Sequence, residues 1–147
     1  MKQIKWLFFA TMMVICFTSF SQNNNVVIDP RLKQIYSEAE LNKLKKEAPD
    51  KIAYYNLYLN NYCSVEKSAP TNGIYKGDVS IIKANLGSNW VVDPNSFDIK
   101  SFNILKFHIP LEIDKKIYYS IGNSNTFLVF ISITEFSNIY KNQSSSK

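Results

Sequence analysis

The pattern of apolar and polar positions divides the chain into a helical half and a strand-like half. Apolar residues recur at helical spacing after Ser37 and again after Pro49, whereas from Val79 onward they gather in short β-branched and aromatic runs. Helices followed by strands are typical of an α+β domain whose helices cover one face of an antiparallel sheet. We therefore expect two N-terminal helices packed on one face of a four- to five-stranded, mainly antiparallel sheet, and a short C-terminal helix.

The boundaries of the two N-terminal helices follow from local signals. Ser37 can cap the unpaired amides of a first turn, and Glu40 stands three residues on, where it completes a capping box. Pro49 ends this helix, because the residue before a proline is pushed out of the α-helical region. Proline is also suited to the first turn of a helix, so Pro49 opens a second one that should run to about Tyr62.

The second helix carries a wider apolar arc than one core contact requires. At about 100° per residue, one face collects Ile52, Tyr55, Tyr58, Leu59 and Tyr62. Tyr54 and Leu57 lie well round the side of the helix. Either the helix is covered on two sides by its own domain, or it offers tyrosines to another molecule. On the second interpretation, the candidate partner-binding residues are Tyr54, Leu57 and Tyr58.

Strands are expected in the second half of the chain. Composition predicts a loop over Ser64–Gly77, and four strand candidates follow, with a shorter one at Trp90–Val92. The four are Val79–Ala84, Phe102–Ile109, Ile117–Ile121 and Phe127–Thr134. The last two flank turn residues around Gly122 and predict an antiparallel hairpin. The nearly continuous apolar run from Phe127 suits a central strand covered on both faces.

The first residues, Met1–Ser21, have the features of an export signal. Two lysines precede an apolar run, Trp6–Phe17, that is too short to span a bilayer comfortably. Ser19 and Ser21 supply the small residues that signal peptidase accepts, so we expect a mature chain that begins at Gln22, without a stable membrane span. The alternative is an uncleaved anchor helix.

The remainder has the length of one domain. About 126 residues follow the predicted signal, enough to bury a sizeable core once. Residues 22–36 are expected to form a leader with a short edge strand at Val26–Ile28. Residues 37–141 form the single α+β domain, in which Phe136, Ile139 and Tyr140 indicate the closing helix. Residues 142–147 are a disordered polar tail.

Charge and cysteine content exclude several classes of function. The net charge is +5 for the whole chain and +3 once Lys2 and Lys5 are removed, which is too little to favour nucleic-acid binding. Most of the excess lies in one cluster: Lys43, Lys45, Lys46 and Lys51. With Cys16 in the signal, Cys63 has no intramolecular disulfide partner, and no thiolate metal cage can form. We expect Cys63 to be a buried thiol.

Candidate catalytic and metal-binding groups are sparse. His108 is the sole histidine, which excludes every multi-histidine metal site. If Phe102–Ile109 is a strand, His108 lies on its partly wet face. Asp93, Asn95 and Asp98 do not follow the calcium-loop spacing, and Asp93 with Pro94 and Asn95 fits a turn between strands better. We therefore assign no catalytic residue, metal ligand or cofactor, although a Cys63–His108 dyad stays open as an alternative.

Two segments carry a resemblance to known proteins. The sequence Ser-Phe-Ser-Gln over Ser19–Gln22, followed by asparagines, resembles the export signals of flavobacterial-type Gram-negative bacteria. The segment Tyr36–Lys46, leading into Tyr54–Tyr62, is similar to small uncharacterised exported proteins of that group. This resemblance implies a periplasmic or cell-surface setting near secretion or gliding machinery, and no reaction type.

These observations lead to one expected function and two alternatives. We expect an exported, non-enzymatic module that binds a partner protein at the cell envelope, because a tyrosine-rich arc is present and no catalytic constellation is assembled. One alternative is a small-ligand binding module whose aromatic pocket lies between the second helix and the sheet. The other is a hydrolase built around Cys63 and His108.

Overall fold

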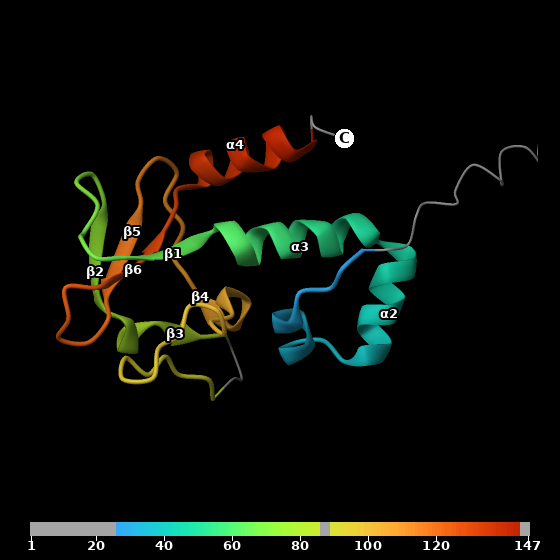
Figure 1. Ribbon diagram of the computed structural model, residues 1–147, viewed down its shortest axis with the longest axis horizontal. Coiled ribbons are helices and arrows are strands. Elements are labelled where there is room, and N and C mark those ends of the chain that lie inside the picture. Colours follow the sequence, from blue (N-terminus) through green and yellow to red (C-terminus); the bar gives the residue numbers. More distant parts are fainter. Residues whose placement is uncertain (1–25, 86–88, 145–147) are drawn as a thin grey trace, which may run out of the picture.

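The computed structural model describes residues 26–85 and 89–144, and its architecture is the expected α+β fold (Figure 1). Within these ranges, three α-helices accompany a four-stranded, mainly antiparallel sheet, and a two-stranded sheet lies below them. The predicted export signal, Met1–Ser21, lies outside the described residues, as does the start of the leader.

The two N-terminal helices form where local signals place them. Helix α2 spans Glu38–Glu47, and its capping box is complete. The Glu40 amide donates to Ser37 Oγ at 3.3 Å, and the Ser37 amide donates to Glu40 Oε2 at 2.8 Å. Hydrogen bonds from Ser37 hold the pKa of the Glu40 carboxyl below its usual value. Helix α3 spans Pro49–Asn61 and begins at its proline, where an amide would be unpaired anyway.

A short 3-10 helix precedes them, and the edge strand predicted at Val26–Ile28 does not form. This helix, η2, spans Pro30–Gln34 and begins at Asp29, whose carboxylate accepts a hydrogen bond from the Arg31 amide at 2.9 Å. The segment Val26–Ile28 is irregular, and one of its carbonyls accepts a hydrogen bond from the Asn56 side chain in α3. The edge-strand prediction is wrong because this segment pairs with a helix.

The main sheet has the strand order β1-β6-β5-β2. Its strands are β1 at Cys63–Glu66, β2 at Ile74–Asp78, β5 at Ile117–Ser120 and β6 at Phe127–Phe130. Strand β6 pairs antiparallel with β1 and β5, whereas β2 joins the other edge of β5 in parallel. The predicted hairpin is confirmed as β5–β6. The prediction of a central, covered strand is also confirmed, since Leu128, Val129 and Phe130 are all buried.

The loop predicted over Ser64–Gly77 is wrong, because β1 and β2 lie largely within it. Strand β1 follows α3 almost directly and pairs along its whole length with β6. Strand β2 contains a bulge at Gly77, whose φ of 120° is a conformation that glycine adopts without a steric penalty. Glycine and polar residues therefore fit a short, bulged edge strand as well as a loop.

Two other predicted strands are interrupted by 3-10 turns. Val79–Ala84 divides into η3 (Val79–Ile81) and β3 (Lys83–Ala84). Phe102–Ile109 likewise contains η4 (Ile104–Lys106) and β4 (Phe107–His108), and β3 and β4 pair antiparallel as the second sheet. The segment Trp90–Val92 is irregular.

The interruptions have a common local cause. The Asp78 carboxylate accepts a hydrogen bond from the Ser80 amide at 2.9 Å, and the Asn103 side-chain oxygen accepts one from the Leu105 amide at 3.1 Å. Short polar side chains that bond the backbone two residues further on offer it an alternative to a strand ladder. Apolar alternation alone therefore overestimates the length of both strands.

The last element is helix α4, which spans Ile133–Ser144. It confirms the predicted closing helix, but the preceding strand is shorter than predicted and ends at Phe130. The Ser132 hydroxyl accepts a hydrogen bond from the Glu135 amide at 3.1 Å, which favours a helix start at this point. Residues 142–144 belong to α4, so the predicted disordered tail begins too early. Its remaining residues lie outside the described part of the chain.

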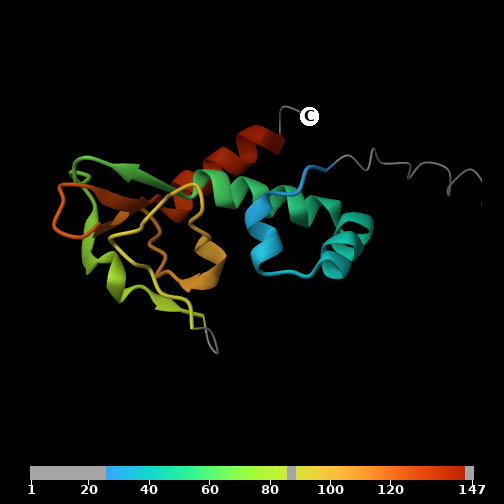
Figure 2. The same ribbon diagram turned by 60° about the horizontal axis from the view of Figure 1, so that its bottom comes forward.

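The arrangement of these elements is visible in two views. Helix α3 leads into the sheet through β1, α4 runs alongside α3, and α2 lies across the far end of α3 (Figure 1). The turned view keeps α4 beside α3 (Figure 2). The core lies where α3, the main sheet and the segment before β4 meet. At its centre is Phe130, 1% exposed, whose ring centroid is 6.4 Å from Tyr62 and 6.3 Å from Phe102.

Candidate functional site

Aromatic side chains of α3 and α4 form one cluster. The rings of Tyr54 and Tyr58 stack with centroids 6.2 Å apart, and both meet Phe136 edge-on, at 5.9 and 5.3 Å. Tyr140, one turn further along α4, meets Tyr54 at 5.6 Å. Tyr54 is 39% exposed and Tyr140 is 45% exposed, so part of the cluster faces solvent. We call Tyr54, Tyr58, Phe136 and Tyr140 the tyrosine surface.

The end of this cluster nearest the core is buried and uncharged. Tyr58 stacks on the buried Tyr62 with ring centroids 4.5 Å apart. Burial raises the pKa of Tyr62 to about 12 and raises the pKa of Tyr58 as well. The hydroxyl of Tyr62 is buried with no hydrogen-bond partner among the described residues. Both phenols are therefore neutral at physiological pH, and the cluster behaves as an apolar surface with hydroxyl groups.

The three predicted partner-binding residues lie in two different environments. Tyr54 and Tyr58 belong to the tyrosine surface, whereas Leu57 is 7% exposed and part of the core. The expectation that Leu57 lies on an open face is wrong. Helix α3 is contacted by α4 at Tyr54 and by the N-terminal segment at Asn60, and at 100° per residue Leu57 falls between these two directions. The helix is thus covered by its own domain at Leu57.

Cys63 lies at the junction of α3 and β1, beside a cavity of about 270 Å³ whose lining includes Arg31 and Lys100. The thiol is partly buried. Burial raises the pKa of Cys63 to about 12, against the smaller opposing effect of the Arg31 charge. Thiolates are the nucleophilic form of cysteine, so this thiol is unreactive at neutral pH.

His108 lies elsewhere in the fold. It is exposed on β4, paired with Lys83 of the second sheet, and it does not line the cavity that Cys63 lines. The expectation that His108 lies on a wet face is confirmed. The Cys63–His108 dyad has no support from this geometry. Among residues 26–85 and 89–144, no group of three or more His, Cys, Asp or Glu side chains could hold a metal ion.

The raised pKa of Cys63 predicts slow alkylation. At pH 8 we expect iodoacetamide to modify Cys63 at least about tenfold more slowly in the folded protein than in urea, where the thiol pKa returns to about 8.5. Peptide mapping by mass spectrometry separates Cys63 from Cys16. Equal rates in the two conditions would contradict the burial of the thiol.

A second cavity, of about 400 Å³, opens between the segment before η4 and the η4–β4 turn. We call it the loop pocket. Its aromatic lining consists of Trp90, Phe97, Phe102 and Phe107. The ring of Phe102 stacks on Phe107, with centroids 5.4 Å apart and planes within 7°, and contacts Phe97 at the same centroid distance. Since Phe102 also contacts Phe130 of the core, this aromatic wall is fixed to the sheet.

The polar rim of the loop pocket is held by two turns. Asp93 accepts hydrogen bonds from the Asn95 amide and the Ser96 hydroxyl, both at 2.9 Å, which confirms the predicted turn at this point. Asp98 accepts from the Lys100 and Ser101 amides, at 3.1 and 3.2 Å. These backbone hydrogen bonds, led by the Asn95 and Lys100 amides, hold the pKa of each carboxyl below its usual value. Both groups are therefore ionised at neutral pH.

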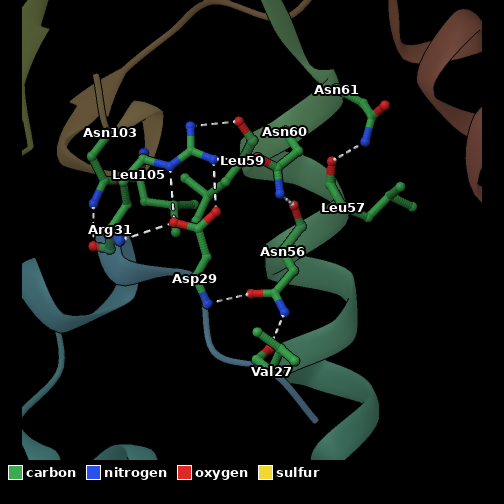
Figure 3. A network of polar contacts seen from close by, with 10 residues as sticks. All are labelled: Val27, Asp29, Arg31, Asn56, Leu57, Leu59, Asn60, Asn61, Asn103 and Leu105. Atoms are coloured by element: carbon green, nitrogen blue, oxygen red, sulfur yellow. Dashed lines mark hydrogen bonds and ion pairs between the residues drawn. The ribbon is translucent and has the colours of Figure 1, made fainter. Parts of the chain in front are cut away.

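A polar network ties η2 to α3 (Figure 3). Arg31 Nη2 lies 2.7 Å from Asp29 Oδ2, and Arg31 also donates to the Leu59 carbonyl and the Asn60 side chain, at 2.9 and 2.6 Å. The hydrogen bond from Arg31 lowers the pKa of Asp29. The Arg31 carbonyl accepts a hydrogen bond from the side-chain amide of the buried Asn103 at 2.7 Å. Asn103 lines the loop pocket, so the network also positions its wall.

Sequence reasoning missed both the network and the loop pocket. Asp29 directly before Pro30 is a helix-start signal that would have predicted η2. The loop pocket differs from the aromatic pocket of the ligand-binding alternative, since its aromatic residues belong to the segment before β4 and to β4 itself rather than to the second helix.

Comparisons with known proteins add no relative. The chain matches no protein-family model, no curated protein and no solved structure. A separate search of the described helices found none whose length and apolar character would allow it to cross a membrane.

Proposed function

We propose that this chain is an exported protein of the cell envelope that binds a partner protein through the tyrosine surface and catalyses no reaction. The proposed setting is periplasmic or at the cell surface, near secretion or gliding machinery, as the export-signal pattern and the resemblance imply. A protonated, partly buried Cys63 and an exposed His108 in a different sheet favour binding over hydrolysis.

One observation carries the proposal: Tyr54 and Tyr140 are both exposed, and they contact each other across the seam between α3 and α4. Tyrosine is enriched among the residues that dominate binding energy at protein interfaces. Binding usually loses side-chain entropy when such residues are immobilised. Here the rings are already packed against Phe136, so less of that entropy remains to be lost.

The surroundings of the tyrosine surface indicate the chemistry of the partner. The Lys51 ammonium lies 5.8 Å from the ring centroid of Tyr55, which in turn contacts Tyr54 at 6.2 Å. Lys43 and Lys46 are exposed on the adjacent α2. Asp50, exposed one turn before Tyr54, adds a negative charge on the same side of α3, so these surroundings favour a partner with an apolar patch and a rim of mixed charge.

The tyrosine surface can be tested by substitution. We expect Tyr54→Ala or Tyr140→Ala to reduce crosslinking to the envelope partner by at least about tenfold, since interface tyrosines often contribute 2 kcal/mol or more. Crosslinking is performed in intact cells that produce the full chain, and the partner band is quantified by mass spectrometry.

Tyr75→Ala is the matched control. Tyr75 is 53% exposed on the edge strand β2 and is not part of the tyrosine surface. The control should retain the crosslinked partner, and thermal melting should show that all three variants are folded. An equal loss for Tyr75→Ala and Tyr54→Ala would refute binding at the tyrosine surface.

A further inference from the structure

The loop pocket presents an apolar wall with a fixed orientation. Phe102 is buried between Phe97 and Phe107, and its contact with Phe130 holds this wall against the sheet. Trp90 lines the same cavity, with the Lys106 ammonium 4.4 Å from its ring centroid. A ligand that fits this wall needs an apolar face, because aromatic rings offer contact area and few hydrogen bonds.

The rim of the loop pocket is rich in groups that can bind hydroxyls. Both oxygens of Asp93 and of Asp98 accept hydrogen bonds from the chain. An ionised carboxylate has about four acceptor positions, so each retains capacity for a ligand donor. Gln34 and Ser101 also line the cavity. The side-chain amide of Gln34 can donate and accept, whereas the Ser101 hydroxyl donates to the Asp98 carbonyl at 3.1 Å and can only accept from a ligand.

The charges of the rim favour a neutral ligand. Asp93 and Asp98 carry negative charge, whereas Lys106 carries positive charge in the same cavity. The two carboxylates disfavour an anionic ligand at the rim, and the Lys106 ammonium beside Trp90 disfavours a cationic group against the aromatic wall. A neutral ligand that carries both donors and acceptors satisfies the carboxylates and the ammonium together.

The size of the loop pocket limits the ligand further. Its volume of about 400 Å³ lies near the lower end of the range of about 300–1,000 Å³ that is typical of ligand pockets. We propose that the loop pocket binds a neutral, polyhydroxylated ligand, a mono- or disaccharide, with its apolar ring face on the aromatic wall and its hydroxyls on Asp93 and Asp98. This inference is independent of the tyrosine surface, none of whose residues lines the pocket.

Trp90 offers a direct readout of binding. The full chain is titrated with galactose, N-acetylglucosamine, maltose and cellobiose, and with benzylamine and benzoate as charged aromatic probes. At least one saccharide should change the tryptophan emission saturably, with a Kd of about 1 mM or tighter. The change should disappear in Trp90→Phe, because Trp6 is the only other tryptophan of the chain. Isothermal calorimetry provides the same Kd without the fluorophore.

Two variants test the rim, and a third controls for charge. Asp93→Asn should weaken the saccharide by about tenfold, because a charged acceptor becomes neutral. Gln34→Ala changes an exposed position on η2. It should weaken binding of the saccharide about threefold without affecting the turn at Asp93. Glu47→Gln, exposed at the end of α2, should leave the Kd unchanged. The inference is overturned if no saccharide saturates below about 50 mM, if a charged probe binds more tightly, or if folded Gln34→Ala and Asp93→Asn both bind like the wild type.

Discussion

Replacing Arg31 with methionine is expected to lower the free energy of unfolding by about 3 kcal/mol, because it leaves a carboxylate without its partner. The Arg31 and Asp29 side chains are only 11% and 9% exposed. Arg31 also donates to the Leu59 carbonyl and to Asn60, which would lose that donor in the variant. Urea denaturation monitored by circular dichroism measures the change.

Lys33→Met is the matched control for this substitution. Lys33 lies on the same 3-10 helix but is exposed, so the same change of residue should alter stability by less than about 0.5 kcal/mol. The double variant with Asp29→Asn should recover part of the loss, since no buried carboxylate then remains. Similar losses for Arg31→Met and Lys33→Met would show that the ion pair does not hold η2 to α3.

The same pair gives a dependence of stability on pH. Arg31 lowers the pKa of Asp29 in the folded state, so the ionised carboxylate stabilises the fold above its unfolded pKa of about 3.9. This stabilisation is lost as the pH falls below that value and through the lowered folded pKa. In Arg31→Met, the decrease in stability between pH 5 and pH 2 should therefore be smaller than in the wild type.

The starts of the two N-terminal helices and the β5–β6 hairpin could be predicted from the sequence. The start of α2 depends on Ser37 and Glu40, which bond each other within one turn, and the start of α3 depends on Pro49. The hairpin of β5 and β6 was predictable because its apolar runs flank a turn that contains Gly122, whose φ is 60°. In each case the determining residues are close in the sequence.

Elements that depend on distant partners could not be predicted in this way. Strands β1 and β2 are short and polar in composition, and they become strands because the central pair β5–β6 offers a free edge on each side. The loop pocket likewise brings Gln34, the segment around Trp90 and Lys106 together from distant parts of the chain. No period or spacing in the sequence marks that convergence.

The candidate partner-binding residues were predicted only in part, because the packing around α3 depends on distant segments of the chain. The apolar arc of α3 identified Tyr54 and Tyr58, because a helix wheel gives the direction of each side chain. It did not show from which directions α3 is covered. Helix α4 leaves Tyr54 partly exposed, whereas Leu57 is buried, and this difference arises only from the packing of the folded chain.

Substitutions at Leu57 and Tyr54 compare a core position and a partly exposed position of the same helix. Leu57→Ala should lower the free energy of unfolding by about 3 kcal/mol, because it removes buried methyl groups and leaves a cavity in the core. Tyr54→Ala should cost less, since Tyr54 is 39% exposed whereas Leu57 is 7% exposed. Urea denaturation of both variants measures the two changes.

The comparison also bears on the proposed interface. A small loss for Tyr54→Ala together with reduced crosslinking would assign the ring to partner binding, because the fold would not need it. If Tyr54→Ala instead costs as much as Leu57→Ala, the ring serves the packing of α3 on α4, where it contacts Phe136 and Tyr140. The tyrosine surface would then lose its main anchor, and reduced crosslinking would report partial unfolding of the α3–α4 seam.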